Sequence, residues 1–388
     1  MIAMKRKFWV PVLLLAFHFF AASSQSTTGW LNIDCGSDTP RLDANTLLSW
    51  DTDSGLIKSG INKYVSEKQQ LDEMNTVRSF LKGKQNCYKL KVYKKKVRYL
   101  IRAGFCYGNY DGLSSPPTFD LHLDGKKWTT VKTSMIGDPI YREAIYEARS
   151  DHISLCVVRV KDGGVPFISS IEVVPLEAPF PLYPKMQSSH TFNLESRVNL
   201  GGDEVIRYTG ILSDEKYNRI WTRGVTPPNC DEVTTDSDSS TENEPPDEVI
   251  GDSIESQNLT NPITLSVDIS QTPTPQSAYI VLYFAEKTFL EAGDIRIIQI
   301  YIDDHMKSTV TLEFNKCKVI TIYPVIPVGP RMSVTLASDS GSNLPPMISA
   351  MEVFTTLDKS SAPILHCRFF CALINFVISC TCLFLFLA

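Results

Sequence analysis

The chain has 388 residues, of which 43% are hydrophobic, 21% charged and 10% aromatic, and its formal net charge is −5. This is the composition of a globular protein with room for two or three domains. The acidic balance excludes the strongly basic character of nucleic-acid-binding proteins, so we expect no nucleic-acid partner.

The N-terminus has the pattern of a secretory signal peptide. Basic residues 5–7 precede an apolar run over residues 8–20, and the small residues Ala22 and Ser24 follow at once. We therefore predict a signal peptide over residues 1–24 and entry into the secretory pathway.

Short alternating runs dominate the middle of the chain, where helical periodicity is scarce. Bounded by Gly, Asn, Asp and Pro, such runs are typical of β-sandwiches and barrels. They lie at 99–105, 119–124, 153–158, 168–174, 263–269, 279–285, 295–302, 319–323 and 347–354. We predict an all-β fold.

The strand pattern is duplicated. Residues 166–173 (PFISSIEV) align with 346–353 (PMISAMEV) at an offset of 180, with five identities, and 99–101 fall on 279–281 at the same offset. An offset that is nearly constant over several strands predicts two similar lobes, at 26–180 and 190–357. Each is long enough to bury its own core.

Two features lie between the sets of strands. Residues 231–252 contain nine acidic residues and no Lys or Arg, and we predict a solvated loop there. The sequence Asn258-Leu259-Thr260 follows it and is an acceptor for N-glycosylation at Asn258.

The C-terminal stretch 369–388 is 20 residues long and has no charged residue. As a helix it would be about 30 Å long, which matches the hydrocarbon core of a bilayer. The small residues at 360–362 are also compatible with a lipid-anchor signal, whose hydrophobic tail is removed. A transmembrane helix and a lipid anchor both place the protein at the outer face of a membrane.

Cysteine usage fits an exported protein. Six cysteines lie between the two ends, and an even number in a secreted region favours disulfides whose pairing the sequence leaves open. They are Cys35, Cys87, Cys106, Cys156, Cys230 and Cys317. None forms a CxxC pair, so we expect no zinc site, no other metal and no cofactor.

Several motifs resemble one family. The segments WLNIDCG at 30–36, YLIRAGFCYGNYDG at 99–112 and LPPMISAME at 344–352 are similar to the plant malectin-like extracellular domain. That domain forms the outer part of many leucine-rich-repeat receptor-like kinases. The resemblance covers nearly all of the chain between its two ends and implies two tandem malectin-like β-sandwich lobes of jelly-roll-like form. We find neither leucine-rich repeats nor kinase signatures in the sequence.

No catalytic motif is legible. HExxH, GxSxG and the phosphate-binding loop are absent from the sequence, and the four histidines of the lobes are dispersed: His122, His152, His190 and His305. We therefore predict that the protein is not an enzyme. The alternative, an extracellular glycan-active enzyme, would need two carboxylates in one cleft.

Two clusters are candidates for sugar binding, which the resemblance to malectin implies. Tyr107, Asn109, Tyr110 and Asp111 combine aromatic rings with hydrogen-bonding groups, as does Trp50 beside two aspartates. The competing interpretation is structural: the glycines and Asn109 permit a tight turn while the tyrosines pack under the loop.

A run of basic residues contains Lys94, Lys95 and Lys96. Read as the turn of a hairpin, it would present positive charge to anionic wall polysaccharides such as pectin. The alternative is that these lysines protect a strand edge against unwanted pairing.

Taken together, these patterns predict a receptor-like protein at the extracellular face of the plasma membrane that binds cell-wall carbohydrate without catalysis. The alternative is a secreted peptide as ligand, with the protein acting as a co-receptor or decoy of a receptor-like kinase.

Overall fold

The computed structural model describes residues 27–135, 138–178, 182–234, 241–270 and 276–358. Nearly all regular structure in this part is β-strand. The exceptions are the helix α1 (Asp247–Gly251) and the 3-10 turn η1 (Asp72–Met74), so the predicted all-β fold is confirmed. Neither of these helices is long and apolar enough to cross a membrane. The predicted signal peptide and the tail 369–388 lie outside the described residues.

Lobe 1, which contains β1 to β13, has two larger sheets and a small one. Its main sheet runs in the order β2 (Arg41–Leu42), β3 (Ser49–Thr52), β1 (Leu31–Asp34), β13 (Ser170–Pro175), β7 (Arg98–Phe105) and β10 (Ile140–Glu147). The second sheet is β6 (Gln85–Lys91), β11 (His152–Arg159), β8 (Thr118–Leu123) and β9 (Lys126–Lys132). The small sheet is β12 (Phe167–Ile168), β5 (Thr76–Ser79) and β4 (Ile61–Tyr64).

Lobe 2, which contains β14 to β25, repeats this topology. Its main sheet is β15 (Thr222–Arg223), β14 (His190–Asn199), β25 (Ala350–Asp358), β19 (Ala278–Glu286) and β22 (Lys316–Val325). The second sheet is β18 (Ile263–Asp268), β23 (Arg331–Ser338), β20 (Ile297–Ile302) and β21 (His305–Thr311). The small sheet is β16 (Cys230–Thr234), β17 (Asp252–Ser256) and β24 (Met347–Ile348).

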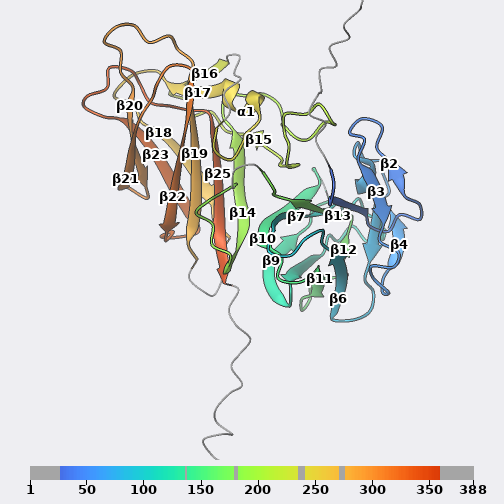
Figure 1. Cartoon of the computed structure of the whole chain (residues 1–388). Helices are drawn as coiled ribbons and strands as arrows, with labels where there is room; N and C mark the ends of the chain where they lie inside the picture. Colours follow the sequence, from blue (N-terminus) through green and yellow to red (C-terminus); the bar gives the residue numbers. More distant parts are fainter. Residues whose placement is uncertain (1–26, 136–137, 179–181, 235–240, 271–275, 359–388) are drawn as a thin grey trace, which may run out of the picture.

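The two main sheets join into one. Ala144 and Ile145 of β10 pair antiparallel with Asn193 and Phe192 of β14, which makes a single sheet of 11 strands across both lobes (Figure 1). Each lobe has its own apolar core between its sheets. A third apolar cluster covers the opposite face of the joined sheet. This explains why β19 is buried along its whole length, whereas β18 alternates between buried and exposed residues.

A row of buried charges crosses the junction. In register, Glu172, Arg102 and Glu143 lie on three neighbouring strands of lobe 1, and Arg197 pairs with Glu352 in lobe 2. Arg102 contacts Glu143 at 2.8 Å and Glu172 at 3.1 Å. Arg197 contacts Glu143 at 2.7 Å and Glu352 at 2.6 Å, so its guanidinium bridges the two lobes.

Two local expectations are corrected. The acidic stretch 231–252 is not a continuous loop, because β16, α1 and the start of β17 lie within it, and Val249 and Ile250 are buried. The lysine-rich segment is not the turn of a hairpin: β6 pairs with β11 and β7 pairs with β10 and β13, so β6 and β7 belong to different sheets.

Candidate ligand-binding site

The loop after β7 requires its residue types. Gly108 has φ +43°, and a Cβ there would lie 2.5 Å from Cβ of Val65. Asn109 follows with φ +48°, in the left-handed region that Asn tolerates better than most residues. The Gly-Asn pair therefore allows the tight turn and lets the β4–β5 connection lie close to this loop.

The two tyrosines of this loop are buried. Tyr107 is 2% exposed and Tyr110 is 8% exposed. Their rings contact each other at 5.6 Å between centroids, and Tyr110 packs on Phe167 at 5.2 Å. Burial raises the pKa of Tyr110 to about 12. Neither ring offers a free face on which a sugar could stack.

The polar groups of the same loop bind one another. The hydroxyl of Tyr107 donates to Asp111 Oδ1 at 2.6 Å and accepts from the backbone N–H of Ser115 at 3.1 Å. Asn109 Oδ1 accepts from the backbone N–H of Ser114 at 2.9 Å. Burial, and then the bond to Asp111, raise the pKa of Tyr107. These hydrogen bonds hold the loop in one conformation, in which it forms a rigid wall.

That wall encloses one side of a cavity of about 210 Å³. The cavity lies where three connections of lobe 1 meet: β4–β5, β7–β8 and β9–β10. Its lining residues are Ser66, Glu67, Gln69, Phe105, Cys106, Tyr107, Gly108, Asn109, Thr133, Ser134, Met135, Asp138 and Ile140. The β9–β10 connection also contains residues 136–137, which lie outside the described part of the chain.

Two carboxylates in this cavity carry no ion pair among the described residues. Glu67 contributes only its backbone carbonyl, to the amide of Gln69 at 2.9 Å, and Asp138 has no contact of this kind. Carboxylates with open lone pairs can accept hydrogen bonds from ligand hydroxyls. Sequence reasoning missed both residues, because they are ordinary polar loop residues until the fold brings them together.

Trp50 does not form an open site either. It is 3% exposed and packs in a cluster with Leu48 and Tyr208, and Arg41 lies over its ring at 5.2 Å. Tyr208 comes from lobe 2, so lobe 2 covers this tryptophan. The neighbouring Asp53 is buried and accepts two bonds from Arg78, at 2.9 and 2.5 Å.

The three candidate lysines differ in their surroundings. All are exposed, in the connection between β6 and β7. Lys94 forms an ion pair with Glu177 at 2.9 Å, whereas Lys95 and Lys96 form none with the described residues. The hydroxyl of Tyr99 stabilises this turn by accepting from the backbone N–H of Lys94 at 2.8 Å and donating to its carbonyl at 2.7 Å.

Asn258 is exposed in the connection between β17 and β18. Its side-chain oxygen accepts from the N–H groups of Thr260 at 3.1 Å and Asn261 at 3.0 Å. The position is accessible, and glycosylation there stays a prediction.

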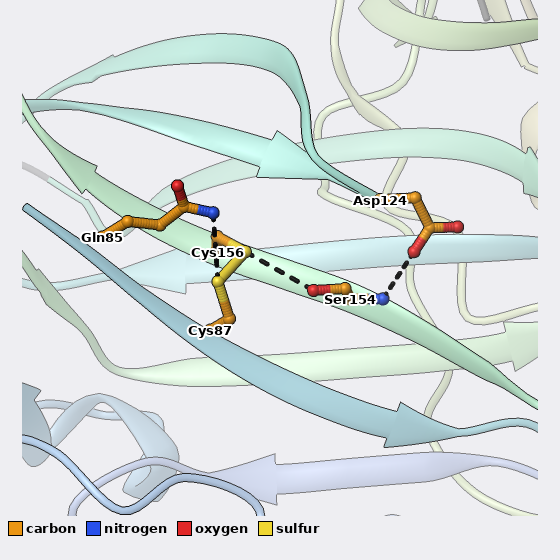
Figure 2. The surroundings of a disulfide bond; sticks show 5 residues. All are labelled: Gln85, Cys87, Asp124, Ser154 and Cys156. Carbon is orange, nitrogen blue, oxygen red and sulfur yellow. Dashed lines mark hydrogen bonds between the residues drawn. A yellow bond between two sulfur atoms is a disulfide. The ribbon is translucent and has the colours of Figure 1, made fainter. Parts of the chain in front are cut away.

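One disulfide is present in the described part of the chain. Cys87 of β6 and Cys156 of β11 face each other in register and are bonded (Figure 2). Gln85 donates to the sulfur of Cys87 at 3.2 Å, and Ser154 lies 3.5 Å from that of Cys156. The remaining four described cysteines, Cys35, Cys106, Cys230 and Cys317, are free thiols.

Among the residues that the structure describes, no group of three or more His, Cys, Asp or Glu side chains is arranged to hold a metal ion. The four histidines lie on four different strands: His122 is in β8, His152 in β11, His190 in β14 and His305 in β21.

Two β-sandwiches of one topology, joined edge to edge through their main sheets and carrying a polar cavity at the loop end of lobe 1, define a tandem β-sandwich protein. The family model of the malectin-like domain matches residues 33–356, and the chain belongs to this family.

Curated relatives come from Arabidopsis thaliana. The chain is 29% identical to the probable LRR receptor-like serine/threonine-protein kinase At1g51880 over 355 residues, which are 87% of this chain and 39% of that protein. It is 28% identical to the uncharacterized protein At1g24485 over 347 residues, 88% of this chain and 66% of that one. The chain therefore spans about two fifths of the length of the matched receptor kinase.

Solved structures share the fold. The ANX2 ectodomain from Arabidopsis thaliana matches with a TM-score of 0.68 at 15% identity, over 85% of this chain and 97% of that one. A chain in the crystal structure of the plant peptide RALF23 in complex with FER and LLG2 matches with a TM-score of 0.67 at 14% identity, over 86% of this chain and 96% of that chain.

Proposed function

We propose that the protein is a receptor-like binding protein at the extracellular face of the plasma membrane, and that it captures the end of a cell-wall carbohydrate in the lobe 1 cavity. The observation that carries this proposal is the polar cavity with the unpaired carboxylates of Glu67 and Asp138. The lining combines amide, hydroxyl and carboxylate groups with the apolar side chains of Phe105 and Ile140, a mixture that suits the two kinds of surface on a sugar ring.

The size of the cavity limits its occupant. At about 210 Å³ it is smaller than the roughly 300–1,000 Å³ of typical small-molecule sites. It would therefore hold a terminal sugar unit, with the rest of the polymer over the loops outside. The buried tyrosines would act by holding the wall in place, which revises their expected role from stacking partners to supports.

Filling the cavity should remove carbohydrate binding. In Met135→Trp the larger side chain would occupy the space beside Thr133 and Ser134, and we expect at least about a tenfold loss of affinity for any saccharide that the wild type retains on a glycan array. Leu113→Trp is the matched control, because Leu113 is exposed and lies outside the cavity lining. Equal binding by both variants would place the carbohydrate elsewhere, and an array with no wild-type binding would end the proposal.

Lys95 and Lys96 would add contact with anionic polymers. We expect the double variant Lys95→Glu/Lys96→Glu to bind polygalacturonate several-fold more weakly than wild type at low salt, and added salt to reduce the difference. The double variant Lys161→Glu/Lys307→Glu, at two exposed residues outside this connection, serves as the control for net charge. Retention of polygalacturonate by the double variant at wild-type levels would exclude this contact.

A peptide ligand is the second candidate. It is supported by the fold shared with a chain from the structure of the peptide RALF23 in complex with FER and LLG2. It predicts peptide capture that Met135→Trp leaves intact. Catalysis is not part of the proposal, in keeping with relatives that are receptor ectodomains.

A further inference from the structure

A second cavity lies at one end of lobe 2. It has a volume of about 370 Å³ and is formed by the end of β14, the connection from β14 to β15, α1 and the start of β17. In Figure 1, α1, β15 and β17 lie together at this end. Its lining residues are Asn199, Asp203, Glu204, Val205, Ile206, Arg207, Thr209, Leu212, Ser213, Asp214, Glu248 and Asp252.

Negative charge in this cavity is not balanced. Of its five carboxylates, only Asp203 forms an ion pair among the described residues, with Arg223 at 3.0 Å. The single basic residue of the lining is Arg207, and its charge acts on Glu73 and Tyr141 of lobe 1, where it opposes the rise in pKa that burial causes. Four of the five carboxylates of the lining therefore form no ion pair among the described residues, and the single charge of Arg207 is too small to balance them. They are Glu204, Asp214, Glu248 and Asp252.

The carboxylates are close enough to affect one another. Partial burial raises the pKa of Glu248, and the charges of Asp214, Asp247, Asp252 and Glu204 raise it further. Like charges held together in this way destabilise the folded chain, and a bound cation would remove that repulsion.

A buried amide gives an independent sign of a missing partner. Asn199 is 1% exposed, and its Nδ2 donates to Asp252 at 3.3 Å, but its Oδ1 has no hydrogen-bond partner. An unsatisfied buried acceptor costs about 1–3 kcal/mol, so such groups are rare without a reason. A Cβ at Gly202 would lie 2.1 Å from Asn199 Nδ2 and 2.4 Å from Asp252 Oδ2. Only glycine at this position leaves room for the pair.

The available groups favour an organic cation over a metal ion. The carboxylates that form no ion pair are acceptors when ionised, and they match ligands that only donate, such as ammonium and guanidinium groups. No metal-binding group of three side chains occurs in the described ranges. The lining also includes Val205, Ile206 and Leu212, which can pack against an aliphatic stem.

We propose that this cavity of lobe 2 binds an ammonium or guanidinium group carried on an aliphatic stem, with Asp214, Glu248 and Asp252 as charge partners. The group could belong to a free polyamine or to a Lys or Arg side chain of a peptide. The site is separate from the lobe 1 cavity, so it stands whether or not carbohydrate binding is found there.

Calorimetric titration of the full chain tests the proposal. The probes are spermidine and a short Lys-rich peptide, with the same peptide acetylated on its lysines as the matched neutral probe. We expect binding of at least one cationic probe, no binding of the acetylated peptide, and an affinity that falls with salt. If spermidine binds, a free polyamine can occupy the site. If the peptide binds and spermidine does not, the ligand is a side chain of a peptide.

Two exposed carboxylates allow substitution without disturbing the core. Asp214→Asn combined with Glu248→Gln should lower the affinity by about tenfold or more, because each removes one charge-assisted contact. Glu291→Gln, elsewhere on the surface of lobe 2, should leave it unchanged. Absence of binding by every probe, or equal binding by the double variant with an unchanged melting temperature, would overturn the proposal. Displacement of the probe by Ca²⁺ at equal concentration would also overturn it in favour of a metal site.

Discussion

Replacing Arg197 with Met is expected to lower the free energy of unfolding by about 3–5 kcal/mol, the range for removing one partner of a buried ion pair. Arg197 is buried and bridges Glu143 of lobe 1 and Glu352 of lobe 2, at 2.7 and 2.6 Å. Methionine keeps much of the aliphatic volume but leaves Glu352 without its ion-pair partner. The loss therefore comes from uncompensated buried charge.

Arg223→Met is the matched control. Arg223 has 54% of its side chain exposed and pairs with the exposed Asp203. Surface pairs of this kind contribute about 0–1 kcal/mol. Urea unfolding followed by circular dichroism would give both values. A loss for Arg197→Met no larger than that for Arg223→Met would show that the buried row of charges does not hold the lobes together.

The effect of Arg197→Met should depend on pH. Burial pushes the pKa of Glu143 upward, but Arg197 and Arg102 outweigh it and hold the pKa below its ordinary value of 4.5. A carboxyl group whose pKa is lowered by folding stabilises the protein at pH values above its ordinary pKa. This stabilisation is lost as the pH falls through the folded-state pKa. The difference between wild type and Arg197→Met should therefore be full near neutral pH and shrink in strong acid.

The repeat was visible in sequence where the strands must be apolar on both faces. Residues 99–105 and 279–285 lie within β7 and β19, and 168–174 and 347–354 cover β12–β13 and β24–β25. Of these strands, β7, β13, β19 and β25 lie between a lobe core and the third apolar cluster, so their composition is constrained in both lobes. The predicted all-β fold rested instead on short alternating runs separated by turn residues.

The junction between the two lobes could not be predicted from the sequence, because it depends on contacts between segments that are far apart in the chain. Pairing of β10 with β14 involves only two residues on each strand. Arg102 inside an otherwise apolar run was a signal of a buried charge, since a lone arginine in a central strand needs a partner. Sequence reasoning did not use it, and the identical Glu172 and Glu352 were read only as markers of the repeat.

The candidate sites show the same limit. Sequence reasoning selected residues by chemical type, and the structure places Tyr107, Tyr110 and Trp50 in apolar clusters. Tyr208, which covers Trp50, is 158 positions away in the chain. Both cavities are lined mainly by loop residues, which have no periodic pattern. The sequence therefore could not predict that Glu67 and Asp138 line one cavity, or that Asn199 and Glu248 line another.

Gly36→Ala and Gly201→Ala are each expected to destabilise the chain by more than about 4 kcal/mol. The two glycines follow β1 and β14, with φ +81° and +90°. A Cβ at Gly36 would lie 2.2 Å from the carbonyl oxygen of Val77 in β5, and one at Gly201 would lie 2.2 Å from that of Ser253 in β17. The same close approach thus occurs in both lobes, and a main-chain atom cannot move aside as a side chain can.

The variant Gly112→Ala tests the effect of backbone strain without a steric clash. Gly112 has φ +71°, but nothing lies within 4 Å of a Cβ there. The variant should be destabilised only by the roughly 1–2 kcal/mol that the left-handed backbone conformation costs a residue with a Cβ. Scanning calorimetry of the three variants would give the comparison, and losses of equal size would show that the contacts with β5 and β17 are unimportant.

The same experiment measures how tightly the lobes are coupled. Gly36 lies in lobe 1 and Gly201 in lobe 2, yet one sheet and one row of buried charges cross the junction. We therefore expect a single unfolding transition that both variants move to lower temperature. Two transitions, with each variant shifting only that of its own lobe, would mean that the lobes unfold independently and that the shared sheet contributes little to stability.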